Sequence, residues 1–333
     1  MQAYRNRARN LYVRHQWLNR AGRKFRTRAR LGTLLMHKIP IGQTIALAYR
    51  FLFSEIGTII GICWFPALLS SLASYLTAIY AATHEEQIEA RELGPEAVYA
   101  VVSILGIAIS IFAASVMAVA LTRHVLGRRA TGVVAYFAVG PVEWRMFGAI
   151  VRYIAGAMAL LVAAIVISAI AFSLAGVPVD AAATVRATPP NIIAGLVAWA
   201  AFIAAFLVML RIGFFIPPTI VAEENGGLRR SFELTSGNVL RALAVLAVLG
   251  TPVLLLLLGG EAVLLRSALG PALYRLSPAE FFERATSAMQ QKLLPWEVFT
   301  AVVFILGSAL IYGGSAIAYR ARLGEDEVRP PRA

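Results

Sequence analysis

Arginine and glutamate side chains recur in a short polar stretch between two long apolar segments. The stretch covers 211–241 and reads RIGFFIPPTIVAEENGGLRRSFELTSGNVLR. A guanidinium group can pair with a carboxylate, or it can hold a phosphate through two parallel hydrogen bonds. The spacing therefore predicts either an ion-pair network or a contact with lipid phosphates. The candidate residues are Arg211, Glu223, Glu224, Arg229, Arg230 and Arg241.

Two interpretations of this stretch remain open. In the structural one, Glu223 or Glu224 pairs with a nearby arginine and fixes a short surface helix that starts near Leu228. Thr235 or Ser236 then caps the next helix by accepting a backbone N–H. In the binding one, the arginines hold a lipid phosphate. We favour the structural interpretation, because cytoplasmic loops of membrane proteins are rich in Arg and Lys without needing a ligand.

No other residues have the spacing of a catalytic or metal site. The sequence contains no HExxH, no glycine-rich phosphate loop followed by Lys, and no serine nucleophile elbow. Residues 84–89 (HEEQIE) could hold a cation loosely, but a solvated acidic loop is the better interpretation. Cys63 is the single cysteine, which excludes an internal disulfide. We therefore expect a protein that is not an enzyme and that carries no cofactor or metal.

The elements around these residues are long and free of charge. The chain has 333 residues, of which 59% are hydrophobic and 15% charged, whereas soluble domains average about 25% charged. Crossing a bilayer takes about 20 apolar residues in a helix. Six segments of at least 19 residues contain no Asp, Glu, Lys or Arg: 56–83, 97–122, 153–179, 187–210, 242–260 and 298–319.

These segments predict an all-α membrane protein with six transmembrane helices. Runs such as 254–258, five leucines in a row, lack the alternation of membrane β-strands. Glu55, Arg152, Arg211 and Arg241 lie near predicted span ends, and no predicted span has a charge at its centre. This argues against an ion-coupled transporter that works through carboxylates.

The basic residues predict the orientation of the chain. The net charge is +13, and 12 Lys and Arg precede residue 51, whereas the first acid is Glu55. The loop at 84–96 is acidic. Because Lys and Arg stay on the cytoplasmic side, we expect both termini to be cytoplasmic. The strong bias of the basic residues toward Arg further suggests a bacterial protein of the inner (plasma) membrane.

Residues 1–35 differ from the rest of the chain. They hold ten basic residues and no acid, with apolar residues seven apart. Either this is a surface helix on anionic lipid headgroups, or translation starts at Met36 and the extension is not made. A nucleic-acid arm is the weaker interpretation of such a charge run. We divide the chain into this extension, a membrane domain at 36–323 and a charged tail at 324–333.

Amphipathic surface elements precede pairs of predicted spans. They lie at 40–54, at 130–146 and within 211–241, so that one surface element and two spans recur about three times, over 36–129, 130–225 and 226–323. A further helix on the outer face is expected after Ser277, which begins a capping sequence. Small residues at 307–318 and around Gly156 indicate close helix contacts.

The polar stretch resembles part of the membrane domain found on some bacterial glycerophosphodiester phosphodiesterases and in related stand-alone membrane proteins of unassigned function. The segment 36–42 (MHKIPIG) resembles the start of that domain, so the resemblance covers about 36–322. It implies a fold and a location but no activity, because the catalytic barrel of those enzymes is a separate soluble domain. The matching residues are Arg211, Pro217, Glu223, Glu224, Leu228, Arg230, Ser231, Leu234, Thr235, Gly237 and Arg241.

Taken together, the sequence predicts a multi-pass membrane protein that organises lipid or partner proteins. Its expected partners are membrane lipids, especially those with anionic headgroups. The alternative is a permease or lipid carrier for a weakly polar substrate. Polar groups around a wide cavity would favour the carrier, and a solid core of small and aliphatic residues would favour the organiser.

Overall fold

The computed structural model describes residues 38–127, 139–176, 189–223, 227–269 and 291–324. Every regular element in these ranges is a helix. Six helices are long and apolar enough to cross a membrane, which confirms the predicted all-α, multi-pass membrane protein. They are α3 (Ile56–Thr83), α5 (Leu93–Val125), α6 (Pro141–Leu174), α7 (Pro189–Gly213), α10 (Val239–Leu269) and α12 (Leu293–Arg322).

The contacts divide the chain into two units. One is Ile39–Tyr319, which contains nearly all of the described structure, and the other joins Met1–Lys38 to Arg320–Ala333. The architecture below is that of Ile39–Tyr319. The predicted basic extension at 1–35 and residues 325–333 of the predicted tail lie outside the described residues, as does most of the predicted outer helix after Ser277.

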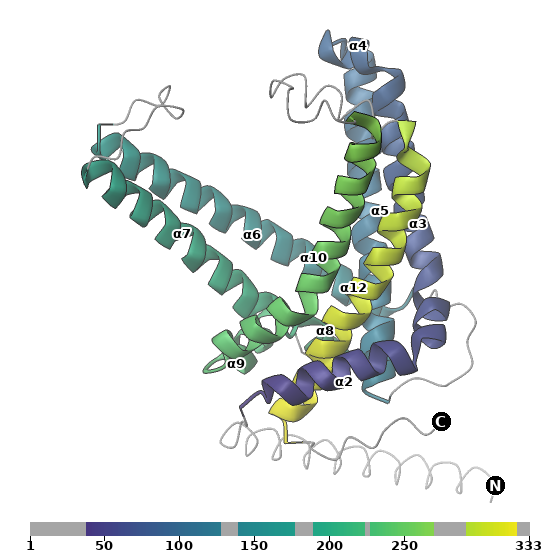
Figure 1. The fold of residues 1–333 in the computed structure, drawn as a ribbon, viewed down its shortest axis with the longest axis vertical. Coiled ribbons are helices and arrows are strands. Elements are labelled where there is room, and N and C mark those ends of the chain that lie inside the picture. The colour runs from purple at the N-terminus through teal and green to yellow at the C-terminus, as the bar shows by residue number, and fades with distance from the viewer. Residues whose placement is uncertain (1–37, 128–138, 177–188, 224–226, 270–290, 325–333) are drawn as a thin grey trace, which may run out of the picture. The chain divides into compact units, whose positions relative to one another are not determined.

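Four short helices lie at the two ends of the long ones. Three of them, α2, α8 and α9, lie at the same end, and we call them the platform; α4 lies at the opposite end (Figure 1). Contacts join α8 to α5, α6 and α9, α9 to α7, and α2 to α10. Their bounds are Ile41–Ser54 for α2, Glu85–Glu89 for α4, Ile216–Ala222 for α8 and Leu228–Thr235 for α9.

The best-packed core lies next to the platform. Residues 116–121 of α5 are completely buried. Ala118 and Val119 of this run form one apolar cluster with Met146 of α6 and with Ile216 and Ile220 of α8. Because small side chains alternate with branched ones here, α5, α6 and α8 can approach closely without cavities. The core therefore fixes α8, whose C-cap is Glu223 and which contacts α9, the helix that carries Arg230.

Glycines of α12 let its neighbours come close, as the sequence predicts. A Cβ on Gly314 would lie 2.4 Å from Leu249 Cδ1 of α10, and one on Gly313 would lie 2.9 Å from Phe51 Cδ1 of α2. Packing within the bundle is wrong for Gly156, because nothing lies within 4 Å of its Cβ position; the alternative, a contact between copies of the chain, stays a prediction. That residue lies on an exposed face of α6, because α6 packs on α7 through other residues such as Tyr153.

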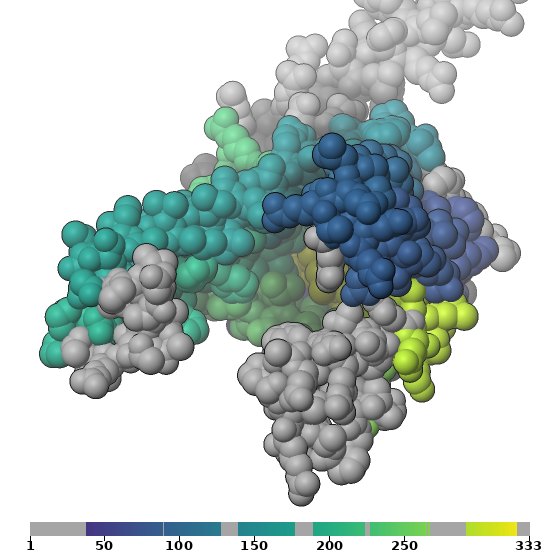
Figure 2. Space-filling view, turned by 90° about the horizontal axis from the view of Figure 1, so that it is seen from above, coloured from purple at the N-terminus to yellow at the C-terminus, as the bar shows by residue number. Residues whose placement is uncertain are grey.

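Helices α6 and α7 pack along each other. Tyr153 of α6 lies against Gly213 of α7, where a Cβ would meet its hydroxyl oxygen at 2.9 Å. Farther from the platform most large side chains of this pair are exposed, as at Val162 and Trp199. In the space-filling view α6 and α7 form one ridge and α5 another, with a hollow between them (Figure 2).

The surface element expected at 130–146 lies mostly outside the described residues, which omit 128–138. Its last residues, 141–146, belong to α6, which runs unbroken from Pro141 to Leu174. Helix α7 ends at Gly213, and Pro217 and Pro218 lie in the first turn of α8. Proline is tolerated there because the first N–H groups of a helix need no partner within it. The threefold repeat stays a prediction, since only its first and third surface elements are described.

Candidate functional site

The residues singled out in the polar stretch lie on the platform, but they do different things. Arg230 of α9 pairs with Glu223, which ends α8: its Nε donates to both carboxylate oxygens at 3.1 Å. The hydroxyl of Tyr319, on α12, donates to Glu223 Oε1 at 2.9 Å. Arg230 Nη1 also lies 3.6 Å from Glu233 Oε2. One carboxylate thus connects α8, α9 and the end of α12.

Arg211 is placed differently. It lies in the last turn of α7, and its guanidinium carbon is 3.6 Å from the centre of the Phe232 ring. Its Nε donates to the Phe232 carbonyl at 3.4 Å. Within the described residues, Arg211 has no carboxylate partner. The aromatic ring holds the guanidinium plane by cation–π attraction and leaves its terminal N–H groups unoccupied by an acid.

The turn from α7 into α8 is fixed by a side chain from α9. The backbone N–H of Phe215 donates to Ser231 Oγ at 3.0 Å, a bond that replaces the one lost where α7 ends. Both residues are fully buried, and an unsatisfied N–H there would cost about 1–3 kcal/mol. Gly237 ends α9 with a left-handed φ of 72°, as glycine after a helix commonly does.

Arg241 fixes the chain that enters α2. Its Nη1 donates to the carbonyl of Ile39 at 3.0 Å, and the N–H of Ile39 donates to Asn238 Oδ1 at 3.1 Å. Ile39 and Asn238 are both buried. The expected cap by Thr235 is not formed, since its hydroxyl donates to Ser231 O at 2.8 Å inside α9. Residues far apart in sequence thus meet where α10 begins.

The other two candidate residues contribute less to this arrangement. Arg229 is 94% exposed and pairs with Glu233 in the same helix, Nε to Oε1 at 3.2 Å, an interaction worth little at a surface. Glu224 lies outside the described residues. The structure therefore brings together Glu223 and Arg230, with Tyr319 added, and gives Arg211 and Arg241 separate partners.

A second ion pair near the platform was not foreseen. Arg123 Nη1 of α5 lies 2.8 Å from Glu143 Oε1 of α6, and the side chain of Glu143 is only 1% exposed. The signal was present, because Glu143 is the only acid among four arginines in 123–146. Sequence alone could not show that the two spans would bring these ends together.

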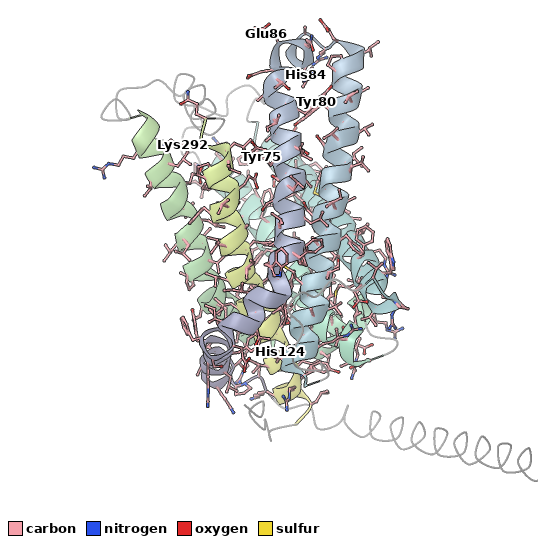
Figure 3. All side chains as sticks on the ribbon, turned by 90° about the vertical axis from the view of Figure 1, so that its right-hand side faces the viewer. Tyr75, Tyr80, His84, Glu86, His124 and Lys292 are labelled. Carbon is pink, nitrogen blue, oxygen red and sulfur yellow. The ribbon has the colours of Figure 1, made fainter. Side chains whose placement is uncertain are left out.

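Among the described residues, no three His, Cys, Asp or Glu side chains cluster in a way that could hold a metal ion. His84 lies beside Tyr80 at the α4 end, and His124 lies at the other end of the helices (Figure 3). No family model matches the chain, and no curated protein or solved structure matches it either. The resemblance to the membrane domain of glycerophosphodiester phosphodiesterases stays a prediction.

Proposed function

We propose that this multi-pass membrane protein is not an enzyme and organises lipid, with the platform as its binding surface for the phosphate of anionic phospholipids. The observation that carries the proposal is the position of Arg211. Its guanidinium carbon lies over the Phe232 ring, at the end of a membrane-spanning helix, with no described acid beside it. A guanidinium held this way presents two N–H donors in the geometry that a phosphate accepts.

The depth of Arg211 supports this ligand. Helix α7 supplies 25 residues from Pro189 to Gly213, about 38 Å of helix, which exceeds a hydrocarbon core of about 30 Å. A residue in the last turn therefore lies at the level of the headgroups. Arg152 of α6 is exposed and lies at the same level, since its neighbour Tyr153 contacts Gly213. Two cationic side chains at this depth favour an anionic lipid over a zwitterionic one.

Rigidity of the platform supports the proposal further. Glu223, Arg230 and Tyr319 form a hydrogen-bonded network among themselves, and no lipid is needed to complete it. This network holds α9, and α9 positions Phe232 beneath Arg211. A binding group that is fixed before the ligand arrives loses little conformational entropy on binding. The structural interpretation of Arg230 and the binding interpretation of Arg211 are therefore compatible.

Native mass spectrometry of the protein released from mild detergent tests the proposal. We expect the wild type to retain anionic phospholipid, and the Arg211→Ala variant to bind it about tenfold more weakly, since a hydrogen bond to a charged group contributes about 1.5–3 kcal/mol. Arg229→Ala is the matched control, because it removes a charge from the same surface without removing a stacked guanidinium. We expect it to bind as the wild type does.

Two results would count against the proposal. Equal loss of lipid in Arg211→Ala and Arg229→Ala would show a diffuse electrostatic attraction with no defined site. Unchanged retention in Arg211→Ala would show that this guanidinium does not hold the phosphate. Phe232→Leu separates stacking from charge: it keeps the arginine, and we expect intermediate retention.

A lipid carrier is the second candidate, and the hollow between the α6–α7 ridge and α5 favours it (Figure 2). Exposed apolar side chains such as Ile165 and Phe206 lie on these helices and would suit acyl chains. A carrier would exchange a fluorescent phospholipid between the leaflets of reconstituted vesicles faster than empty vesicles do. An organiser would retain lipid without accelerating that exchange.

A further inference from the structure

A carboxyl group is buried among membrane-spanning helices far from the platform. The sequence places Glu297 in a loop before the sixth span, but it is the fifth residue of α12, which begins at Leu293. It is only 9% exposed. Its Oε1 accepts a hydrogen bond from Ser74 Oγ of α3 at 2.9 Å. A carboxyl in such a place is costly and is usually functional.

No countercharge for Glu297 is found in the part of the chain that the structure describes. Among the described residues, no Lys, Arg or His forms an ion pair with it. Segments 56–83 of α3 and 97–122 of α5 contain no charged residue at all. The hydroxyls next along α3 have other partners: Ser70 donates to Ser110 at 3.0 Å and Thr77 to the Ala73 carbonyl at 2.9 Å.

Several other titratable groups of the described residues lie toward this end. The long helices contribute Tyr75 and Tyr80 on α3, Glu96 and Tyr99 on α5, and Glu261 and Arg266 on α10, and Lys292 directly precedes α12; His84, Glu85, Glu86, Arg91 and Glu92 lie in or beside α4. Lys292 and Tyr75 lie at about the same level (Figure 3), and Lys292 is exposed. Glu261 follows Gly260, whose Cβ position meets the Phe299 ring of α12 at 2.3 Å. Helix α10 therefore approaches α12 within two residues of Glu297.

We propose that Glu297 is a proton-binding site between α3 and α12. The neutral acid fits the contacts: one oxygen accepts the Ser74 hydroxyl, and the acid's own proton needs only one acceptor at the other oxygen. The carboxylate would be a buried charge with a single described donor, which costs several kcal/mol more than a neutral group in the same place. Loss of the proton would therefore draw water between α3 and α12 and loosen their contact.

Protons reach this site from the side opposite the platform. About 33 Å of helix separates Glu297 from Tyr319 at a rise of about 1.5 Å per residue, and the hydrocarbon core is about 30 Å thick. Glu297 thus lies near the far boundary of the membrane, and the predicted orientation makes that boundary the outer one. The site does not depend on the proposed lipid contact at the platform, because the two lie at opposite ends of the helices.

Carbodiimide labelling tests the proposal on the full chain in lipid nanodiscs. Dicyclohexylcarbodiimide reacts with a protonated carboxyl in apolar surroundings: the acid proton moves to a carbodiimide nitrogen, and the carboxyl oxygen bonds to the central carbon. Peptide mapping by mass spectrometry locates the product. We expect labelling at Glu297 that falls about tenfold per pH unit above its midpoint, as the protonated fraction does. Glu261, half-buried on α10, is the internal control and should react far less.

Two kinds of result would overturn the proposed proton-binding site. Absence of label at Glu297, or label that does not change with pH, would overturn the proposal, and neither result needs a variant that folds. Glu297→Gln, which mimics the neutral acid, should melt at a temperature that varies less with pH than that of the wild type. An equal pH dependence in both proteins would also overturn it.

Discussion

Replacing Tyr319 with Phe tests whether the platform is held by its charge network. The substitution removes only the hydroxyl that donates to Glu223 at 2.9 Å and keeps the ring, which lies 6.4 Å from that of Phe215, centre to centre. The Arg230–Glu223 pair stays in place. The change therefore isolates one hydrogen bond to a carboxylate.

The expected effect follows from the exposure of the two groups. A hydrogen bond to a charged group contributes about 1.5–3 kcal/mol. The Glu223 side chain is 30% exposed, so water replaces part of the lost bond and about 1.5 kcal/mol is the better figure. In a chain of this size, with an unfolding entropy of about 2.1 cal/mol/K per residue, that corresponds to a fall of about 2 °C in melting temperature.

The assay is thermal unfolding of the detergent-solubilised protein at one fixed heating rate, followed by intrinsic fluorescence. A double-mutant cycle with Glu223→Gln should show a coupling of about 0.5–1.5 kcal/mol between the two side chains. Arg229→Gln is the control and should change the melting temperature by less than about 1 °C, because exposed pairs contribute little. A wild-type melting temperature for Tyr319→Phe, or strictly additive effects, would refute the reasoning.

Two further substitutions test packing and charge burial in the same assay. Gly314→Ala should destabilise the protein by about 1–3 kcal/mol, because its Cβ would lie 2.4 Å from Leu249 Cδ1, whereas Gly156→Ala should be neutral or slightly stabilising; equal effects would contradict the packing of α12. Arg123→Met should cost about 3–5 kcal/mol by removing the cationic partner of a carboxylate that is only 1% exposed, and the double variant Arg123→Met/Glu143→Met should recover much of that loss. A double variant no more stable than the single one would contradict this account of the pair.

The helices were predictable because the bilayer imposes a simple requirement. A span must be long, apolar and helical, and the charge-free segments satisfy this without ambiguity. The bounds were less predictable. Helix α12 begins at Leu293, five residues before the charge-free segment that starts at 298, so the sequence placed Glu297 in a loop. Charge marks where a segment stops being apolar, whereas a helix ends where its backbone hydrogen bonds end.

The candidate site was predictable only in part. The polar stretch was found because it interrupts apolar sequence. The pairing of Glu223 with Arg230 follows from their closeness in the chain, seven residues apart. Tyr319 and Ile39 were not predictable as partners, since each lies far from the stretch in sequence and is brought there by the packing of α12 and α2. Nor could the sequence show that Arg211 would stack on Phe232, because stacking depends on the angle between α7 and α9.

The orientation of the platform underlies both proposals and is open to direct measurement. A membrane-impermeant maleimide applied to intact cells would report the side on which two introduced cysteines lie, Ala90→Cys beyond α4 and Arg229→Cys on α9. Both positions are exposed, and the native Cys63 is buried. We predict that residue 90 is labelled from outside and residue 229 only after the membrane is permeabilised. Labelling of residue 229 in intact cells would contradict the cytoplasmic placement of the platform.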